Sequence, residues 1–431
     1  MRFEQKVYTE IEVAQLLTKV VSELSGALQS VDQTATEKKI EAMNLWAAKY
    51  DEAFEDLIVE EVVKRHVQGI TLCVWAGPPG SGKGTNIETV NVIGGLYAEV
   101  ASQGGARQLP EPMHSRLLNF SLAQSIISTG TKGMFNKPEG EYATYFSALV
   151  PEFGSFVAAG GFVPDAVVSI LVEAMILLRL VQHSHKIQID LWPRTAMQFV
   201  AFDRLVQKIR ANGGKVQEEV VTIKVLKKES MELVKQHLAE SAKISKVIAA
   251  KINEYLKSEW YAALCNKAAL VEDMKERYRV EKEGLTEVFS RLTGEYSDSL
   301  SLAVIEELKI VCDRMEFRFN LVVEKGGIPR PDEYPLSVIR RLAVYTGETA
   351  PVFLEQTAEK NAKKGYYVVS SAGTPQEVIA EILTTLAGAA EITDQWESIL
   401  SLAGEIANSI VYKKELVVEE LLKRVGGILE S

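Results

Sequence analysis

The most constraining feature of this 431-residue chain is a glycine-rich segment, Gly77 to Thr85, which reads GPPGSGKGT. It follows Ile70 to Ala76, a short apolar run of β-forming residues that predicts a buried strand. A helix is expected from about Gly84 to Val100. In such a turn, glycines let backbone N–H groups converge on phosphate oxygens, and the helix amino terminus adds partial positive charge. The segment therefore predicts a phosphate-binding loop, with Lys83 reaching the terminal phosphates of a nucleoside triphosphate.

The residues of this phosphate loop predicted to contact the triphosphate are Gly77, Pro79, Gly80, Ser81, Gly82, Lys83, Gly84 and Thr85. A glycine-rich turn without a ligand is the alternative interpretation, and the lysine, the preceding strand and the two prolines together disfavour it. The generic loop pattern has Ser or Thr directly after the lysine, to ligate Mg²⁺. Here Gly84 occupies that place and Thr85 follows it.

The rest of the chain predicts an α/β fold, a parallel sheet flanked by helices. Three further strands are predicted at Lys186–Asp190, Val220–Val225 and Tyr366–Ser370, with helical patterns between most of them. Apolar residues recur at helical spacing over residues 1 to about 66, from about Glu240 to Lys325, and again from Glu391 to the end. These three stretches predict helical extensions at both ends and a helical insertion.

Composition excludes several classes of protein. The 58 acidic residues against 48 basic ones, a formal charge of −10, argue against a general nucleic-acid binder. The three cysteines lie far apart, which suggests a reducing compartment and neither a disulfide framework nor a zinc site. The amino-terminal residues are charged throughout, and no uncharged apolar run approaches the roughly 20 residues of a membrane helix. A cytoplasmic protein without membrane contact is expected.

The form GxPGxGKGT resembles the phosphate loop of adenylate kinases and their nucleoside monophosphate kinase relatives. Five further segments resemble motifs of that family in the same order: Ile127–Gly130 (ISTG), Ala159–Asp165 (AGGFVPD), Ile189–Thr195 (IDLWPRT) with Gln198, Arg330–Asp332 (RPD) with Arg341, and Ser371–Thr374 (SAGT). Together they cover roughly residues 70–375. Because all of these motifs occur in the same order as in the family, together they support the resemblance more strongly than any single motif does.

The resemblance implies a fold of the P-loop NTPase type and a division of the chain. The predicted division is a helical extension at 1–66, a core at 67–239 with a monophosphate-binding insertion at about 101–180, a helical insertion at 240–328 in the position of the family's lid, the rest of the core at 329–390, and a helical tail at 391–431. It also implies transfer of the γ-phosphoryl group of ATP to a nucleoside monophosphate, with AMP as the expected acceptor and Mg²⁺ as the metal.

Site residues follow from the same resemblance. The acceptor would be bound by Thr129, Gly130, Val163, Arg194 and Gln198, the adenine of ATP by Gly373 and Thr374, and Mg²⁺ by Asp190 through water. The catalytic residues would be Lys83, Arg194, Arg330 and Arg341, because arginines neutralise charge on the transferring phosphoryl group. Taken singly, each arginine reads as a surface ion-pair or solvated residue, and Asp190 as a helix cap. The motif order and the eleven-residue spacing of Arg330 and Arg341 favour the functional interpretation.

The chain also departs from the family. Thr131, Met134 and Leu191 stand where the family has Asp, Arg and Gly, and no arginines match those at the start of the family's lid. Three hypotheses therefore stay open. In the first, the chain is an active nucleoside monophosphate kinase. In the second, it is a weakly active or inactive ATP-binding module with a structural or regulatory role, which contacts itself or a protein partner through its helical extensions. In the third, it is a kinase for another phosphorylated acceptor.

Overall fold

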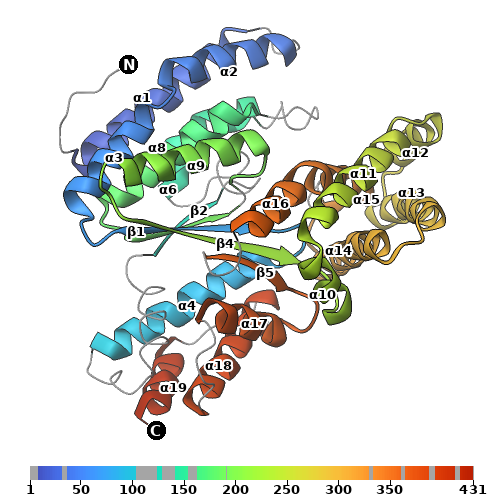
Figure 1. Cartoon of the computed structure of the whole chain (residues 1–431). Helices are drawn as coiled ribbons and strands as arrows, with labels where there is room; N and C mark the ends of the chain where they lie inside the picture. The colour runs from blue at the N-terminus through green and yellow to red at the C-terminus, as the bar shows by residue number, and fades with distance from the viewer. Residues whose placement is uncertain are drawn as a thin grey trace. The chain divides into compact units, whose positions relative to one another are not determined.

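The computed structural model describes residues 8–31, 36–102, 124–128, 141–153, 163–190, 192–329, 333–360, 365–387, 394–412 and 418–430. These residues form two compact units. Unit 1 takes in the described parts of 1–75, 90–220 and 417–431, and unit 2 takes in those of 76–89 and 221–416. The predicted α/β class, a parallel sheet flanked by helices, is confirmed (Figure 1).

The strands of unit 1 are parallel where their register is defined. They are β1 (Ile70–Ala76), β2 (Gln124–Ser128), β3 (Lys186–Asp190) and the first part of β4 (Val216–Lys224). At the carboxyl end of β3, Asp190 pairs with Trp75 of β1 on one side and with Ser128 of β2 on the other. Leu72 and Val74 on one face of β1 are 0 % exposed, and Cys73 and Trp75 on the other face are at most 1 % exposed. Burial on both faces explains why β1 reads as a continuous apolar run rather than an alternating one.

Helices cover both faces of these strands. On one face lie α1 (Glu10–Gln29), α2 (Thr36–Tyr50), α3 (Ala53–Arg65), α8 (Asp165–Val181) and α9 (Ala196–Ala211), and on the other lies α4 (Lys83–Ser102), as Figure 1 shows. The short α6 (Glu141–Phe146) and the 3₁₀ turn Ser147–Leu149 pack on α1, and α19 (Val418–Glu430) completes unit 1. The neighbouring strands β1 and β3 are therefore followed by helices on opposite faces of the sheet, α4 after β1 and α9 after β3.

The described residues of the predicted amino-terminal extension are mostly helical, in α1, α2 and α3. Helix α1 begins at a capping box, in which the Thr9 hydroxyl accepts the Glu12 N–H while the Glu12 carboxylate accepts the Thr9 N–H. Its buried side chains, such as Val13, Leu17 and Val20, follow helical spacing. The extension packs on α8, so it is part of unit 1 rather than a separate appendage.

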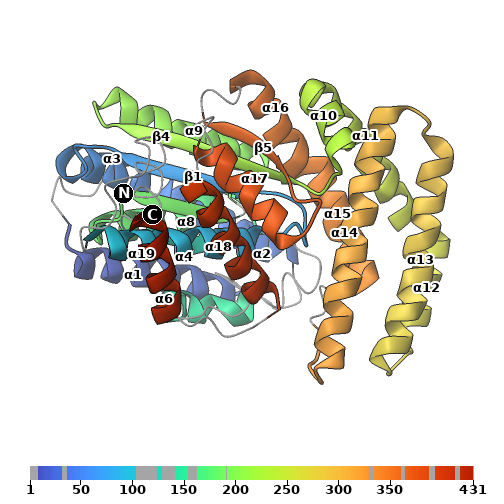
Figure 2. The ribbon, with the colours of Figure 1, turned by 90° about the horizontal axis from the view of Figure 1, so that it is seen from below.

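Unit 2 is mostly helical, as the sequence predicts for residues 240–325. Its elements are α10 (Lys228–Gln236), α11 (Leu238–Leu256), α12 (Glu259–Ala269), α13 (Met274–Glu295), α14 (Ser299–Glu324), α15 (Pro335–Val344), the π-helical turn Tyr345–Thr349, α16 (Ala350–Lys360), β5 (Tyr366–Ser370), α17 (Pro375–Ala387) and α18 (Asp394–Val411). Figure 2 shows α12, α13 and α14 as neighbouring rods, of which α13 contacts both others. Asp273 and Asp298 cap the amino termini of α13 and α14.

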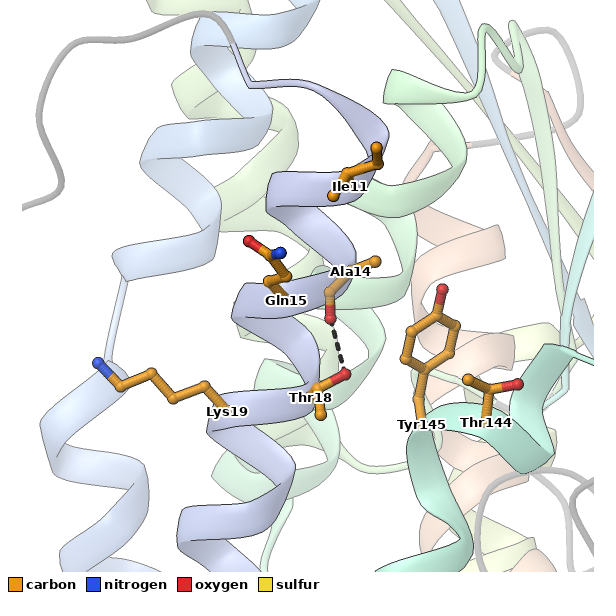
Figure 3. Close-up of a pocket in the computed structure, with 7 residues that line it drawn as sticks. All are labelled: Ile11, Ala14, Gln15, Thr18, Lys19, Thr144 and Tyr145. Atoms are coloured by element: carbon orange, nitrogen blue, oxygen red, sulfur yellow. Dashed lines mark hydrogen bonds between the residues drawn. The ribbon is translucent and has the colours of Figure 1, made fainter.

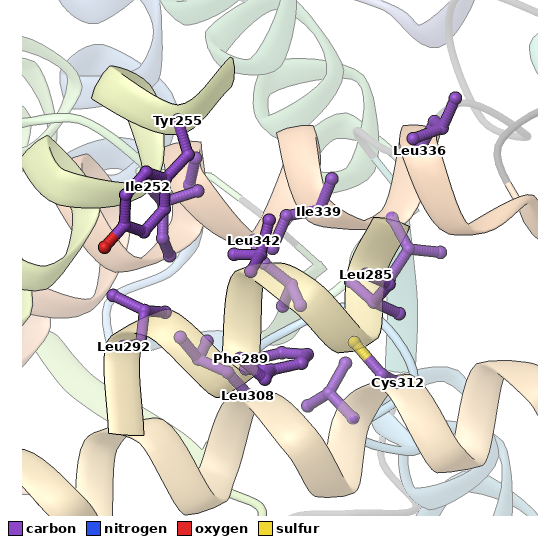
Figure 4. Packing of buried hydrophobic residues seen from close by; sticks show 14 of the residues in the cluster. Ile252, Tyr255, Leu285, Phe289, Leu292, Leu308, Cys312, Leu336, Ile339 and Leu342 are labelled. Atoms are coloured by element: carbon purple, nitrogen blue, oxygen red, sulfur yellow. The ribbon is translucent and has the colours of Figure 1, made fainter. Parts of the chain in front are cut away.

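One apolar cluster holds these helices together (Figure 4). Four helices contribute the side chains labelled there: Ile252 and Tyr255 of α11; Leu285, Phe289 and Leu292 of α13; Leu308 and Cys312 of α14; and Leu336, Ile339 and Leu342 of α15. The helical insertion thus shares its core with α15, which carries the predicted catalytic residue Arg341.

The strand order of the sheet is β2-β3-β1-β4-β5, and β4 passes from unit 1 to unit 2 between Val220 and Val221. The predicted strands at 70–76, 186–190 and 366–370 are confirmed, and β4 begins four residues before the predicted Val220. Strand β2 was not predicted, because QSIIS has only two strongly β-forming residues and takes its conformation from pairing with β3. No described helix is long and apolar enough to cross a membrane.

Candidate functional site

Three glycines of the predicted phosphate loop, Gly77–Thr85, have backbone conformations that only glycine adopts readily. Gly77, Gly80 and Gly82 have φ values of 155°, 74° and 85°. A Cβ atom on Gly77 would lie 2.8 Å from the Ile223 carbonyl oxygen and 2.9 Å from Ser81 Oγ. The close approach of β4 to Gly77 therefore means that any side chain at this position would force the backbone to shift.

Lys83 is the first residue of α4, and its side chain folds back across the loop. Its Nζ donates to the carbonyl oxygens of Gly77 at 2.7 Å and Pro78 at 3.1 Å, and lies 3.4 Å from Ser81 Oγ. The residue is only 8 % exposed. These three contacts hold the ammonium against the backbone of the loop.

Helix α14 of the predicted helical insertion passes close to the same loop, within unit 2. A Cβ atom on Gly80 would lie 3.1 Å from Met315 Sδ and 3.8 Å from the Val311 carbonyl oxygen. Helix α14 is thus in contact with the loop of Gly77–Thr85. Gly84, by contrast, is exposed, and a Cβ atom there would have no neighbour within 4 Å.

Arg314 is a functional candidate that the sequence analysis missed. Its guanidinium donates to Ser371 Oγ at 3.1 Å and to the Ser371 carbonyl oxygen. Ser371 begins the SAGT segment and donates its own N–H to the Lys224 carbonyl oxygen at 2.7 Å. Burial lowers the pKa of Arg314. The available signal was an arginine at the border of the apolar stripe formed by Leu308, Val311 and Met315.

The predicted adenine-binding residues lie at the start of α17. The Thr374 N–H donates to Glu377 Oε2 at 2.7 Å, and the Glu377 N–H donates to Thr374 Oγ1 at 3.3 Å. The bonds that the Thr374 N–H and the Thr374 hydroxyl, the latter at 3.0 Å, donate to Glu377 Oε2 lower the pKa of this carboxyl group. Gly373 has a φ of 145°, and a Cβ atom there would lie 2.7 Å from Glu377 Oε2. The capping of α17 is therefore a structural reason for this motif, alongside its predicted role.

The acceptor-side residues of unit 1 form a hydrogen-bonded group at the starts of α8 and α9. Gln198 Nε2 donates to Asp165 Oδ1 at 2.8 Å, and the Arg194 N–H donates to Gln198 Oε1 at 2.9 Å. The Thr195 hydroxyl donates to Asp165 Oδ2 at 2.7 Å. Val163 lies two residues before Asp165. Because Gln198 is 5 % exposed and uses both ends of its amide, contact with a base requires release of one of these bonds.

Asp190 ends β3 and is paired in register with Trp75, two residues before Gly77. Within the described part of the chain, no group of three or more His, Cys, Asp or Glu side chains could hold a metal ion. A bound Mg²⁺ would therefore depend on water and phosphate oxygens for most of its ligands, which is how this ion is usually held.

Several predicted positions lie outside the described residues. They are the acceptor-side Thr129 and Gly130, the departures Thr131, Met134 and Leu191, and the catalytic candidate Arg330. Arg341, its partner at eleven-residue spacing, is half-buried on α15. The roles given to all of these residues remain predictions.

A pocket in unit 1 has no part in the predicted site. Figure 3 shows that α1 and α6 line it, with Thr18 donating to the Ala14 carbonyl oxygen at 2.8 Å. The lining residues are Ile11, Ala14, Gln15, Thr18, Lys19, Thr144 and Tyr145. None belongs to the phosphate loop or to the acceptor-side group.

In comparisons with known proteins, no family model matches this chain, and no curated protein sequence matches it. The assignment of a function consequently depends on the residues and geometry described above.

Proposed function

We propose that this chain is a nucleotide-binding protein of the P-loop NTPase type that transfers the γ-phosphoryl group of ATP·Mg²⁺ to a nucleoside monophosphate, with AMP as the expected acceptor. The observation that carries the proposal is the phosphate loop itself. Gly77, Gly80 and Gly82 have positive φ, and the buried ammonium of Lys83, the first residue of a 20-residue helix, contacts the Gly77 carbonyl oxygen. A strand, such a loop and a helix form the context in which this motif binds phosphate.

The amino terminus of α4 supports binding of a multiply charged anion. The first internal bond of the helix is donated by the Asn86 N–H to the Gly82 carbonyl oxygen. Earlier N–H groups of the helix, such as those of Gly84 and Thr85, have no partner within the helix. These donors, the helix dipole and the lysine ammonium together would stabilise phosphate oxygens.

The sheet topology gives a second line of support, from unit 1. β1 and β3 are adjacent and parallel, and they lead to α4 and α9 on opposite faces (Figure 1). In open α/β sheets, ligands bind at the carboxyl ends of strands where the connections diverge in this way. The phosphate loop continues from β1, while Asp190 and Arg194 lie at the end of β3 and just beyond it.

In the proposed reaction, catalysis would consist of positioning and charge stabilisation. Arg194 would bind the phosphate of the acceptor with its bidentate guanidinium. Arg330 and Arg341 would neutralise charge on the transferring group, and Asp190 would hold Mg²⁺ through water. Gln198 would bind the adenine edge after releasing Asp165 or the Arg194 N–H.

A second candidate function is an ATP-binding module with weak or no transferase activity. Two observations favour it: Met315 packs against Gly80 of the phosphate loop, and the Gln198 amide is engaged at both ends. Such a module would bind ATP and would act through its helical surfaces.

The test uses the full chain with ATP, Mg²⁺ and each of AMP, GMP, CMP and UMP. Diphosphate formation is measured alongside ATP binding by calorimetry. Lys83→Met should weaken ATP binding by at least about tenfold, since one charge-assisted hydrogen bond contributes roughly 1.5–3 kcal/mol. The control Lys227→Met removes an ammonium that is 73 % exposed and should change nothing.

The outcomes separate the two functions. AMP turnover that Lys83→Met abolishes, and that Arg194→Ala reduces without changing ATP affinity, supports the kinase. ATP binding without turnover of any monophosphate contradicts the kinase and supports the binding module. Equal ATP affinity of the wild type and Lys83→Met contradicts both.

A further inference from the structure

Arg314 adjoins the residues of α14 that approach the phosphate loop. It directly precedes Met315 on α14, and Met315 Sδ is the atom that a Cβ on Gly80 would meet at 3.1 Å. Val311, one turn earlier, faces the same glycine through its carbonyl oxygen. Arg314 thus lies on the segment of α14 that contacts the loop, and all these residues belong to unit 2.

Among the described residues, carboxylates neutralise the buried Lys224 of β4 and the exposed Arg277 of α13 and Arg318 of α14, but not Arg314. Lys224 pairs with Glu307, Arg277 with Glu281, and Arg318 with Glu333. Arg314 donates only to the neutral Ser371 hydroxyl and carbonyl oxygen, and no carboxylate in the described part of the chain forms an ion pair with it. Burial lowers its pKa, with no opposing effect from a nearby carboxylate.

A half-buried guanidinium without a counter-charge is unfavourable unless an anion is bound nearby. Guanidinium groups match phosphate in geometry, because two parallel N–H bonds fit two of its oxygens. The present acceptors are a hydroxyl and a carbonyl oxygen of Ser371, both weaker partners than a charged oxygen. A phosphate beside Gly80 would therefore compete effectively with Ser371 for this side chain.

We propose that Arg314, carried on the helical insertion, contacts the phosphates of a nucleoside triphosphate bound in the loop of Gly77–Thr85, and that α14 serves as the cover of that loop. The proposal rests on triphosphate binding by this loop, as proposed above. The proposal also has a consequence for Ser371, because Arg314 must release this residue in order to bind the phosphate. Binding of triphosphate then changes the link between α14 and the SAGT segment.

The test compares the affinities of Arg314→Met, Arg314→Lys and the wild type for ATP and for adenosine, measured by calorimetry on the full chain. Arg314→Met should weaken ATP binding roughly 10- to 100-fold, as expected for one charge-assisted bond to phosphate. Adenosine has no phosphate, so its affinity should be unchanged. Arg314→Lys keeps the charge but loses the bidentate geometry, and its ATP affinity should be intermediate.

Lys309→Met is the matched control. Lys309 is also on α14 and also donates to a neutral hydroxyl, that of Thr293 at 2.9 Å, but this partner is on α13. The substitution removes the same charge from the same helix and should leave ATP affinity unaltered. Thermal unfolding of each variant establishes that it is folded, and Arg314→Lys gives a reading even where Arg314→Met does not fold.

The outcomes distinguish this inference from the proposed function. If Lys83→Met weakens ATP binding while both Arg314 variants bind as the wild type does, Arg314 is not a phosphate contact and only this inference fails. Parallel loss of ATP and adenosine affinity in Arg314→Met would overturn it too, since Arg314 would then only shape the SAGT segment. If Lys83→Met leaves ATP binding unchanged, the proposed function fails and the inference fails with it.

Discussion

A buried ion pair connects the end of β4 to α14 beside the phosphate loop, and its removal should destabilise unit 2. Lys224 Nζ lies 2.5 Å from Glu307 Oε2, and both side chains are 2 % exposed. The other carboxylate oxygen accepts the Val225 N–H at 3.0 Å. Lys224 follows Ile223, whose carbonyl oxygen is close to Gly77. Loosening this pair would therefore also disturb the support of the loop.

The expected magnitude follows from these contacts. Glu307→Ala leaves a buried ammonium unpaired, which costs about 3–5 kcal/mol. It also removes the acceptor of a buried backbone N–H, which adds about 1–3 kcal/mol. The sum, about 4–8 kcal/mol, is comparable with the whole stability of many domains. Glu307→Gln keeps an acceptor for the Val225 N–H, so it should lower the free energy of unfolding by less. We expect a loss of no more than the roughly 3–5 kcal/mol that the broken ion pair costs.

The assay is denaturant unfolding monitored by circular dichroism, with Glu306→Gln as the neighbouring control. Glu306 faces Lys227 at 3.9 Å, and that lysine is 73 % exposed, so the control should cost less than about 1 kcal/mol. The double variant Lys224→Met/Glu307→Leu removes both charges and should recover much of the loss. Equal unfolding midpoints for Glu307→Gln and Glu306→Gln would refute the reasoning.

Three further predictions follow from single residues. Burial raises the pKa of Glu173 well above its ordinary 4.5. Above pH 4.5, the unfolded chain therefore releases a proton that the folded chain keeps. The free energy of unfolding consequently falls as the pH rises toward the pKa of the folded state. Glu173→Gln should flatten this decline in the unfolding midpoint between pH 5 and pH 8, and an unchanged slope would contradict it. Gly84→Ala should stabilise α4 by about 0.5–1 kcal/mol, because its Cβ has no neighbour within 4 Å, yet weaken ATP binding if phosphate approaches the start of the helix. If Gly84→Ala binds ATP as the wild type does, no phosphate lies close to Gly84. Gly77→Ala, whose Cβ would meet the Ile223 carbonyl oxygen at 2.8 Å, should lower stability by about 1–3 kcal/mol, and a melting temperature equal to that of the wild type would show that the backbone can relax there.

Patterns within the sequence were sufficient for most of the secondary structure. The apolar run of β1 and the glycines after it predicted a buried strand and a loop, and both were found at the expected residues. The helical insertion was likewise predicted from apolar spacing alone. These features depend on neighbours within a few residues, where periodicity and backbone preference act directly. The roles predicted by resemblance for Thr129, Gly130 and Arg330 stay predictions.

The tertiary structure decided which distant residues meet. Strand β2 exists because its backbone pairs with β3, although its own residues favour a strand only weakly. Arg314 and Ser371 are 57 residues apart in the chain, and Lys224 and Glu307 are 83 apart, so no local pattern joins them. The approach of Met315 to Gly80 likewise results from the packing of α14 in unit 2. A local pattern fixes the conformation of a segment, whereas long-range contacts depend on how the completed helices and strands pack, which no short stretch of sequence encodes.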